Sequence, residues 1–364
     1  MKILYINTFD PYQEFHGGAT VTRKELEIIS EIGEVTTLFG QPLRRRKYFI
    51  NPFRFLRDIL SGDSIKLASY CVLHRPPKFY EKFDLIFCNH DFSAYDYRLF
   101  RTLKKPFIVR KHNAEHAFFR EDALLQRIER AKIKYFEEEL GRFSSATVHL
   151  SSSEFLADNY SNSKYHLFPP LISDELLLAT PSSNEFYRHS ERPIDILCVT
   201  NYEWGPNKEG FDWFFDKVAP HLDDKFSIHL IGKGSDRYAG RPSVTSYGYM
   251  EDISKFYKTA KVFIAPILSG AGIKIKNLEA IIYGVPIVTT PVGVDGLSDL
   301  MGCGGATVVT SPEEFAQELR FLLGNEGRCI EQRNIATNWV QKNVVAASRW
   351  RSQVKSLIER AVIS

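Results

Sequence analysis

The protein is 364 residues long, and its 47 lysine and arginine residues nearly balance its 44 aspartate and glutamate residues. Hydrophobic residues make up 44% and charged residues 25%, which argues against disordered, collagen-like and coiled-coil proteins. A net charge of +3 is too small to indicate a nucleic-acid partner, and none is expected. The length exceeds what one hydrophobic core comfortably fills, so two domains are predicted.

The five cysteines are scattered, with no pair at CxxC spacing, which predicts reduced thiols and neither disulfides nor a zinc site. No apolar run reaches membrane-spanning length, and Met1 leads directly into a strand pattern without a signal peptide. We therefore expect a soluble protein of the cytoplasm.

Short apolar runs alternate with helical patterns along the first half of the chain. Strands are predicted at 2–7, 34–40, 84–90, 106–112 and 145–152. Between the first two strands, Val21, Ile28, Ile29 and Ile32 fall on one face of a helix. Because parallel strands need crossover connections, this alternation predicts a parallel sheet covered by helices.

The segment 168–193 is rich in proline and serine and has neither period, which predicts a linker. The alternation then resumes. Strands are predicted at 195–201, 226–234, 244–249, 261–267, 286–291 and 306–310. A closing amphipathic helix is indicated by Trp350, Val354, Leu357 and Ala361.

The pattern predicts an α/β protein of two doubly wound, Rossmann-like domains. The boundaries are 1–170 for the first domain, 171–193 for the linker and 194–345 for the second domain, with a helix over 346–364 packing back on the first. Ligands of open α/β sheets bind beyond the carboxyl ends of the strands. We therefore expect the active site in a central cleft between the domains.

The most informative motif is PILSGAGIKIKNLEAIIYGVPIVTTPVG, at 266–293. A small-residue turn precedes a helix predicted from about Ile273 to Tyr283, which Gly284 stops. Backbone N–H groups at such a helix start bind phosphate, and neighbouring lysines suit a diphosphate. The residues alone fit equally a glycine-rich turn followed by a surface Lys–Glu pair.

This segment resembles the donor-binding signature of retaining GT-B glycosyltransferases of family 4, which reads roughly GAGxxxKxLEAxxxGxPVV. The matching positions are Gly270, Ala271, Gly272, Lys276, Leu278, Glu279, Ala280, Gly284 and Pro286. The resemblance is strong over about 195–300, where 200–222 and 248–267 also match, and weaker in the first half. It implies the GT-B fold, with the nucleotide-sugar donor held by the second domain and the acceptor by the first.

The resemblance also implies individual roles. Glu279 would bind the ribose and Lys276 the diphosphate, while Tyr249 and Met250 would border the nucleobase. The expected donor-binding residues are Gly18, Asn207, Lys208, Tyr249, Met250, Gly270, Ala271, Gly272, Ile273, Lys274, Lys276 and Glu279. Gly18 belongs to a Gly-Gly pair after the first strand, which also fits a plain turn. Many family members have a glutamate where this chain has Ala271.

RKHNAEHAFFRE, at 110–121, places His112 at the carboxyl end of a predicted strand. The resemblance implies a histidine near the donor sugar at an equivalent strand end. His112, Asn113 and Glu115 are therefore the expected catalytic residues, although the residues alone also fit a solvated loop cluster. His90 and Asp91, at another strand end, fit ordinary polar cover.

The segment 42–60, PLRRRKYFINPFRFLRDIL, interleaves arginines and a lysine with aromatic and aliphatic residues. Such a sequence suits an anionic membrane surface or a lipid-linked acceptor. It equally fits an acceptor loop or a solvated basic face, and Pro52 interrupts any single long helix.

We expect a hexosyl- or deoxyhexosyltransferase that transfers a sugar, with retention, from a nucleotide-diphospho-sugar to a saccharide or lipid-linked acceptor in polysaccharide or glycoconjugate synthesis. No metal or other cofactor is expected. The location would be the cytoplasm, including the inner face of the membrane. Ala271 leaves a catalytically silent GT-B-like binding subunit as the alternative. An oxidoreductase is disfavoured because neither half opens with GxGxxG and a following acidic residue.

Overall fold

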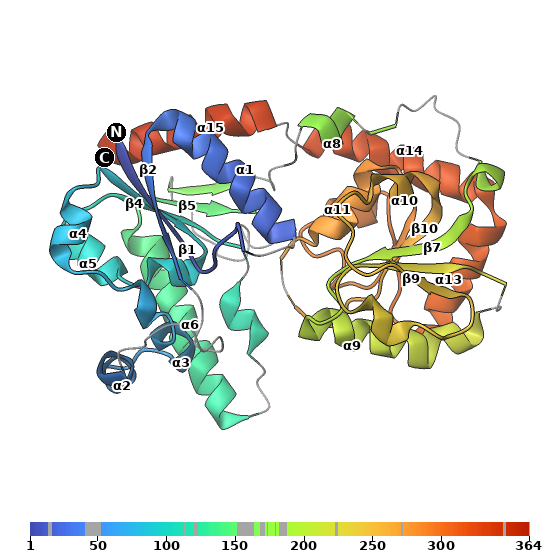
Figure 1. The fold of residues 1–364 in the computed structure, drawn as a ribbon, viewed down its shortest axis with the longest axis horizontal. Helices are drawn as coiled ribbons and strands as arrows, with labels where there is room; N and C mark the ends of the chain where they lie inside the picture. Colours follow the sequence, from blue (N-terminus) through green and yellow to red (C-terminus); the bar gives the residue numbers. More distant parts are fainter. Residues whose placement is uncertain are drawn as a thin grey trace. The chain divides into compact units, whose positions relative to one another are not determined.

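The computed structural model describes residues 1–13, 17–40, 52–112, 114–119, 123–150, 164–167, 172, 174–178, 180–181, 188–222, 225–270, 272–344 and 347–363. The chain forms two compact units, one of Met1–Leu171 with Ala347–Ser364 and the other of Ile172–Ala346. Each unit contains a six-stranded sheet with helices on both faces (Figure 1). All recorded strand pairs are parallel, so each unit is doubly wound as predicted.

The sheet of the first unit has the strand order β2-β1-β3-β4-β5-β6. Its strands are β1 (Lys2–Asn7), β2 (Glu34–Phe39), β3 (Leu85–Asn89), β4 (Phe107–Arg110), β5 (Ala146–His149) and β6 (Tyr165–Leu167). The order changes direction at β1, whose last residue Asn7 pairs in register with Asn89, the last residue of β3. This switch point is where open α/β sheets bind ligands.

Successive residues of each strand point to opposite faces of the first sheet. Ile3 and Tyr5 pack with α1 (Gly17–Ile32) and α15 (Ala347–Ile363), which lie side by side on one face (Figure 1). Leu4 and Ile6 pack with helices on the other face. The predicted terminal helix therefore forms part of the core of the first unit.

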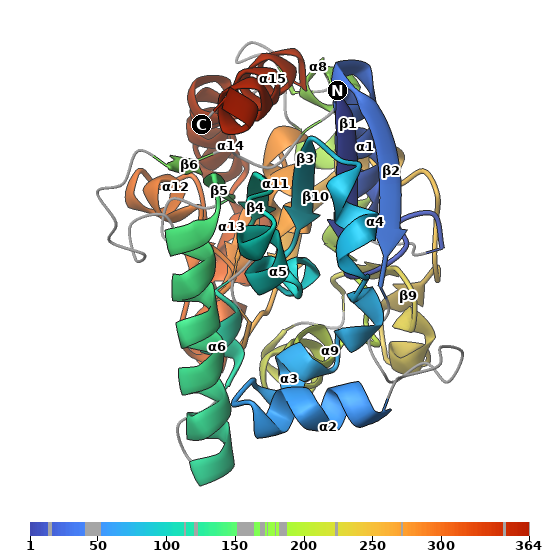
Figure 2. The same ribbon diagram turned by 90° about the vertical axis from the view of Figure 1, so that its left-hand side faces the viewer.

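The other face of the first sheet carries the helices that follow β2, β3 and β4. They are α2 (Pro52–Leu60), α3 (Ile65–Ala68), α4 (Pro77–Glu81), α5 (Tyr97–Thr102) and α6 (Leu124–Phe143). Pro52 is the first residue of α2, a position at which the missing N–H costs nothing. The short helix α3 lies beside the long helix α6, and α2 lies beside α3 (Figure 2).

The sheet of the second unit has the order β12-β11-β10-β7-β8-β9. Its strands are β7 (Ile194–Val199), β8 (Ile228–Ile231), β9 (Val244–Ser246), β10 (Ala260–Ala265), β11 (Ile287–Thr289) and β12 (Thr307–Val308). Its helices are α8 (Asp174–Leu178), α9 (Gly205–Trp213), α10 (Ser254–Thr259), α11 (Ile275–Ile282), α12 (Ser298–Gly302), α13 (Pro312–Gly324) and α14 (Glu326–Asn343). The switch point lies between β7 and β10.

Two hydrophobic clusters cover the faces of the second sheet. Leu197 and Phe263 pack with residues of α10, α11 and α14 on one face. Ile196 and Val262 pack with residues of α9 and α13 on the other. The helices α9 and α11 therefore belong to opposite faces, and each begins beyond the carboxyl ends of the strands.

Every strand predicted from the sequence is present, with ends that differ by a few residues. The short strand β6 and the helix α8 were not predicted. The segment expected to be a linker includes α8, whose Leu176 and Leu177 pack against the core of the second unit. The helix expected to contain Val21 also includes the Gly-Gly pair before it, because α1 begins at Gly17.

Candidate active site

The second unit brings Thr200, Asn207 and Lys276 together at its switch point. Thr200 directly follows β7, Asn207 lies in the first turns of α9, and Lys276 lies in the first turn of α11. The Nζ atom of Lys276 donates to Asn207 Oδ1 at 2.7 Å and to Thr200 Oγ1 at 2.9 Å. The Nδ2 atom of Asn207 donates to the Asn201 carbonyl oxygen at 2.9 Å, which fixes the orientation of the amide. This arrangement holds one ammonium group beyond the strand ends.

Burial makes this ammonium easier to deprotonate than usual. Desolvation lowers the pKa of Lys276 to about 8, with Cys198 raising it and the neighbouring Lys274 lowering it further. The two acceptors described above, the Thr200 hydroxyl and the Asn207 amide oxygen, are neutral and do not cancel its charge. The site therefore presents a cation that gains from contact with an anion.

A glycine sets the distance between α9 and the end of β10. A Cβ atom on Gly210 would lie 1.7 Å from the Pro266 carbonyl oxygen, so only glycine allows this approach. Gly210 is one turn beyond Asn207 on α9. The close packing thus places Asn207 within hydrogen-bond reach of Lys276.

The predicted phosphate-binding turn precedes α11. Gly270 and Gly272 have φ angles of 110° and 79°, values that favour glycine. The Gly272 N–H donates to Asp295 Oδ2 at 2.7 Å, and Lys274 Nζ, which is buried, donates to the Gly272 carbonyl oxygen at 2.5 Å. The buried side chain of Lys274 therefore stabilises the turn. Ala271 lies outside the described residues.

Glu279 lies one turn after Lys276 on α11, as predicted. Its Oε2 atom accepts a hydrogen bond from the Tyr257 hydroxyl at 3.3 Å, and Tyr257 stacks on Tyr283 with ring centroids 5.0 Å apart. Burial raises the pKa of Glu279 to about 7, and the Tyr257 hydrogen bond lowers it. A partly desolvated carboxylate of this kind is suited to accept hydrogen bonds from hydroxyl groups.

The remaining predicted donor residues are more dispersed. Tyr249 and Met250 follow β9; Tyr249 is 56% exposed, whereas Met250 packs on the hydrophobic core. Ile273 also packs on that core. Lys208 follows Asn207 and so points about 100° away around α9. Its Nζ atom makes no hydrogen bond with a described residue, so the structure joins Asn207, and not Lys208, to Lys276.

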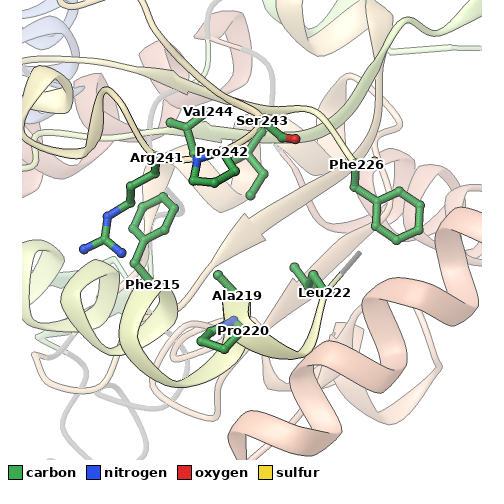
Figure 3. Close-up of a pocket in the computed structure, with 10 residues that line it drawn as sticks. Phe215, Ala219, Pro220, Leu222, Phe226, Arg241, Pro242, Ser243 and Val244 are labelled. Carbon is green, nitrogen blue, oxygen red and sulfur yellow. The ribbon is translucent and has the colours of Figure 1, made fainter. Parts of the chain in front are cut away.

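The second unit also has a pocket beside its edge strands β8 and β9. It is lined by Phe215, Leu222 and Phe226 together with the loop that contains Arg241 (Figure 3). Ile228 and Val244, which also line it, are the first residues of β8 and β9. The pocket therefore lies at the amino ends of the strands, away from Lys276 and Glu279.

In the first unit, His112 lies just beyond the carboxyl end of β4, as predicted. Its Nε2 atom is 2.5 Å from Asn89 Oδ1, and Asn89 Nδ2 donates to Thr22 Oγ1 at 3.2 Å. Asn89 and Thr22 are fully buried. Asn89 Oδ1 can only accept, so this contact is a hydrogen bond when the Nε2 atom of His112 carries a proton.

Glu115 begins a single 3₁₀ turn (Glu115–Phe118) and is buried. Its backbone N–H donates to Glu137 Oε1 at 2.7 Å, and its Oε1 atom is 3.1 Å from His90 Nε2. The rings of His90 and His112 stack with centroids 5.6 Å apart. The structure thus brings His112 and Glu115 together through His90, while Asn113 lies outside the described residues.

The prediction of a glycine loop after β1 was wrong in one respect. Gly18 lies in the first turn of α1 and not in a loop, because the helix extends over both glycines. Sequence reasoning also missed Tyr257, Asp295 and Asn89 as partners of the site. Each meets its partner only through the fold, and no spacing in the sequence marks the contact.

Among the described residues, no group of three or more His, Cys, Asp and Glu side chains is arranged to hold a metal ion. Across the same residues, none of the helices is both long and apolar enough to span a bilayer.

The fold and the strand-end sites define the class of the protein. Two Rossmann-like domains of parallel strands constitute the GT-B glycosyltransferase fold. Residues 193–325 match the sequence model of the family described as "Glycosyl transferases group 1". The match lies within the second unit and, together with the fold, confirms the predicted resemblance to GT-B glycosyltransferases, whereas the assignment to family 4 stays a prediction.

Similar proteins support the same fold over nearly the whole chain. HepE of Anabaena, solved with UDP-glucose among other ligands, is 12% identical with a TM-score of 0.69, covering 99% of each chain. WaaG, a glycosyltransferase involved in lipopolysaccharide biosynthesis, is 17% identical with a TM-score of 0.64, covering 98% of this chain and 99% of WaaG. An uncharacterized 44.6 kDa protein in the cps region of Klebsiella pneumoniae is 23% identical over 338 residues, covering 81% of this chain and 84% of the relative.

Proposed function

We propose that the protein transfers a hexosyl or deoxyhexosyl group from a nucleotide-diphospho-sugar to a hydroxyl group of a saccharide or lipid-linked acceptor, with retention of the anomeric configuration. The observation that carries this proposal is the Lys276 ammonium, held by Thr200 and Asn207 at the switch point of a group 1 glycosyltransferase domain. A cation held in this way is suited to bind an anionic diphosphate.

The chemistry follows from how charge develops. When the sugar leaves, negative charge builds on the diphosphate, and Lys276 stabilises that charge electrostatically. Glu279 accepts hydrogen bonds from the ribose hydroxyls, since its oxygen already accepts from Tyr257 and is partly desolvated. The backbone around the phosphates is shaped by Gly270, Gly272, Ile273 and Lys274. The base is bordered by Tyr249 and Met250. No metal is required for these roles.

The first unit is proposed to supply the acceptor side of the reaction. His112 and Glu115 lie at the carboxyl ends of its central strands, where they hydrogen-bond sugar hydroxyls and the reacting groups. UDP-sugars are the first donors to examine, since HepE was solved with UDP-glucose. The cps region of the Klebsiella relative and the lipopolysaccharide role of WaaG favour a polysaccharide or lipid-linked acceptor.

We also propose that the segment 42–60 contacts an anionic membrane surface. Residues 41–51 lie outside the described part of the chain, so the structural support comes from α2. There Phe53, Leu56 and Leu60 are 84%, 56% and 78% exposed, and the Arg57 side chain is 63% exposed. Exposed apolar side chains beside a cation suit an anionic lipid interface.

The donor site is tested with UDP-glucose, UDP-N-acetylglucosamine, GDP-mannose and dTDP-glucose, by thermal shift and by nucleotide release. We expect one of these donors to raise Tm and to release its nucleoside diphosphate when acceptor is supplied. Glu279→Ala should weaken binding of that donor, whereas Glu331→Ala, at an exposed position of α14, should not. If no nucleoside diphosphate stabilises the protein, the donor-site assignment is wrong.

The same measurements separate enzyme from silent subunit. The observation that favours a silent subunit is Ala271, which stands where many related enzymes have a glutamate. A silent subunit would bind the nucleotide sugar but would release no nucleoside diphosphate, whichever acceptor is supplied. Retention is read from the anomeric proton coupling of the product by NMR, and an inverted product contradicts it.

A further inference from the structure

The backbone of His90 adopts a conformation that is rare for a residue with a side chain. Its φ and ψ angles are 100° and 142°, near the region used almost only by glycine. In the described part of the chain, only Lys104 and Ser243 are further non-glycine residues with positive φ. Residues held in this way concentrate at functional sites.

Several hydrogen bonds hold His90 in this conformation. Its N–H donates to the Arg110 carbonyl oxygen of β4 at 2.9 Å. Its own carbonyl oxygen accepts from the Ser93 N–H at 3.0 Å and from Ser93 Oγ at 2.6 Å. Arg110, at the end of β4, and Ser93, in the turn that follows β3, therefore fix the residue from both sides.

The ring of His90 is oriented as firmly as its backbone. It stacks on Phe92, at a centroid distance of 5.5 Å, and on His112, at 5.6 Å. Its Nδ1 atom accepts the Phe92 N–H at 3.3 Å, so the neutral ring carries its proton on Nε2. That proton points to Glu115 Oε1, 3.1 Å away.

We propose that His90 is a positioning residue for the reaction, holding the Glu115 carboxylate with Nε2 and the His112 imidazole with its ring face. This inference rests on the proposed glycosyl transfer, in which His112 and Glu115 act on the substrate. His90 acts through these two side chains. Asn89 fixes the edge of His112 at Nε2 while His90 fixes its face, so the imidazole is constrained in two directions.

A merely structural role makes a different prediction. If His90 only capped the turn after β3, the residue best suited to its backbone would be glycine, which adopts positive φ without strain. His90→Gly would then keep its activity. The positioning role requires the ring, so the same variant should fold and still lose turnover.

The experiment compares wild type, His90→Gly and Lys104→Gly. Lys104 has a φ angle of 51° and lies just after α5, so its glycine variant is a matched control for backbone relief. With UDP-glucose, UDP-N-acetylglucosamine, GDP-mannose and dTDP-glucose as donors, we expect His90→Gly to lose roughly 100-fold in kcat. The KM for the donor and the circular dichroism spectrum should stay close to those of wild type. Lys104→Gly should match wild type throughout.

Added imidazole provides a rescue test, since it can occupy the space that the His90 ring leaves beside Phe92 and His112. We expect turnover of His90→Gly to recover with imidazole concentration, and that of Lys104→Gly to be unaffected. Wild-type turnover in His90→Gly, or an equal loss in Lys104→Gly, overturns the proposal.

A readout without substrate separates this inference from the proposed function. In protein labelled with ¹⁵N-histidine, the His112 ring signals are assigned with His112→Gln. They should shift in His90→Gly and remain in place in Lys104→Gly. If wild type releases nucleotide from none of the four donors, the proposed function has failed for them, and the NMR comparison alone decides the inference. Unshifted His112 signals contradict it.

Discussion

Lys276 and Asn207 lie 69 positions apart in the chain, yet Lys276 Nζ donates a 2.7 Å hydrogen bond to Asn207 Oδ1. The two residues belong to α11 and α9, which pack on opposite faces of the second sheet. Their hydrogen bond fixes the position of one ammonium group at the switch point between β7 and β10. The donor-site proposal rests on this hydrogen bond, which a substitution of one side-chain group can change.

Asn207→Asp makes that change. The new carboxylate keeps the shape of the side chain but pairs with Lys276 and repels a diphosphate. We expect the Kd for UDP to rise about tenfold or more, equivalent to at least about 1.4 kcal/mol. Isothermal titration calorimetry measures it. Asn325→Asp, at the N-cap of α14 where aspartate caps equally well, should leave the Kd unchanged.

The pKa values of Lys276 and Glu279 predict how nucleotide binding depends on pH. Diphosphate binding needs Lys276 protonated, so affinity should fall as pH rises above its pKa of about 8. Ribose binding needs Glu279 ionised, so affinity should fall as pH drops below its pKa of about 7. Binding of UDP should therefore be tightest between about pH 7 and pH 8.

Single variants assign the two sides of this profile. Glu279→Gln should remove the decrease at low pH, and Lys276→Arg should remove the decrease at high pH, because arginine stays protonated. Calorimetry in buffers of different ionisation enthalpy should detect proton uptake by wild type when UDP binds at pH 8.5. A flat profile from pH 6 to 9 in wild type contradicts the prediction.

The sequence was sufficient for the architecture because buried parallel strands are continuous apolar runs. The strands β1, β3 and β10 have almost no exposed residue, and their apolar runs were recognised directly. The strand β6 has three residues, none of them buried, and so it left no such signal. The two glycines at the start of α1 fitted a turn in the sequence, but the helix includes both of them.

Sequence reasoning selected only those site residues that belong to a local sequence motif. The turn before α11, Lys276 and Glu279 were found through the resemblance, as was His112. The partners that orient them, among them Asn89, Tyr257 and His90, lie on other strands or helices. Such contacts depend on how elements pack, which sequence spacing within one element does not encode. Lys208 was expected beside Asn207 from the resemblance, and its role in donor binding stays a prediction.

Gly210 tests whether the packing of α9 sets the donor site. In Gly210→Ala the new Cβ would meet the Pro266 carbonyl oxygen at 1.7 Å, so the helix must move. We expect a loss of roughly 1–3 kcal/mol in unfolding free energy, together with weaker UDP binding. Gly205→Ala is the control on the same helix, since its Cβ would meet nothing within 4 Å. Urea denaturation should show no loss for Gly205→Ala.

Trp350 tests whether the terminal helix belongs to the core of the first unit. Its side chain is 1% exposed and lies over the Arg110 guanidinium, which forms a 2.7 Å ion pair with Glu25. Trp350→Ala should therefore cost roughly 3–5 kcal/mol, from the lost packing and the uncovered ion pair. Trp204→Ala, at a residue 45% exposed, should cost far less. Urea denaturation followed by circular dichroism compares them, and equal losses would argue against a core role for α15.

Membrane contact through α2 is tested by vesicle sedimentation. The triple variant Phe53→Ser, Leu56→Ser and Leu60→Ser removes the exposed apolar side chains of α2 without touching Phe55, which packs on the core. We expect wild type to bind vesicles containing phosphatidylglycerol, and the variant to bind at least tenfold more weakly. Arg57→Gln should weaken binding about fivefold, because a cation near an anionic surface contributes about 1 kcal/mol, and added salt should abolish that difference. Phe321→Ser, at a residue of α13 that is 48% exposed, is the control. Equal binding by wild type and the triple variant would show that α2 does not contact the lipid.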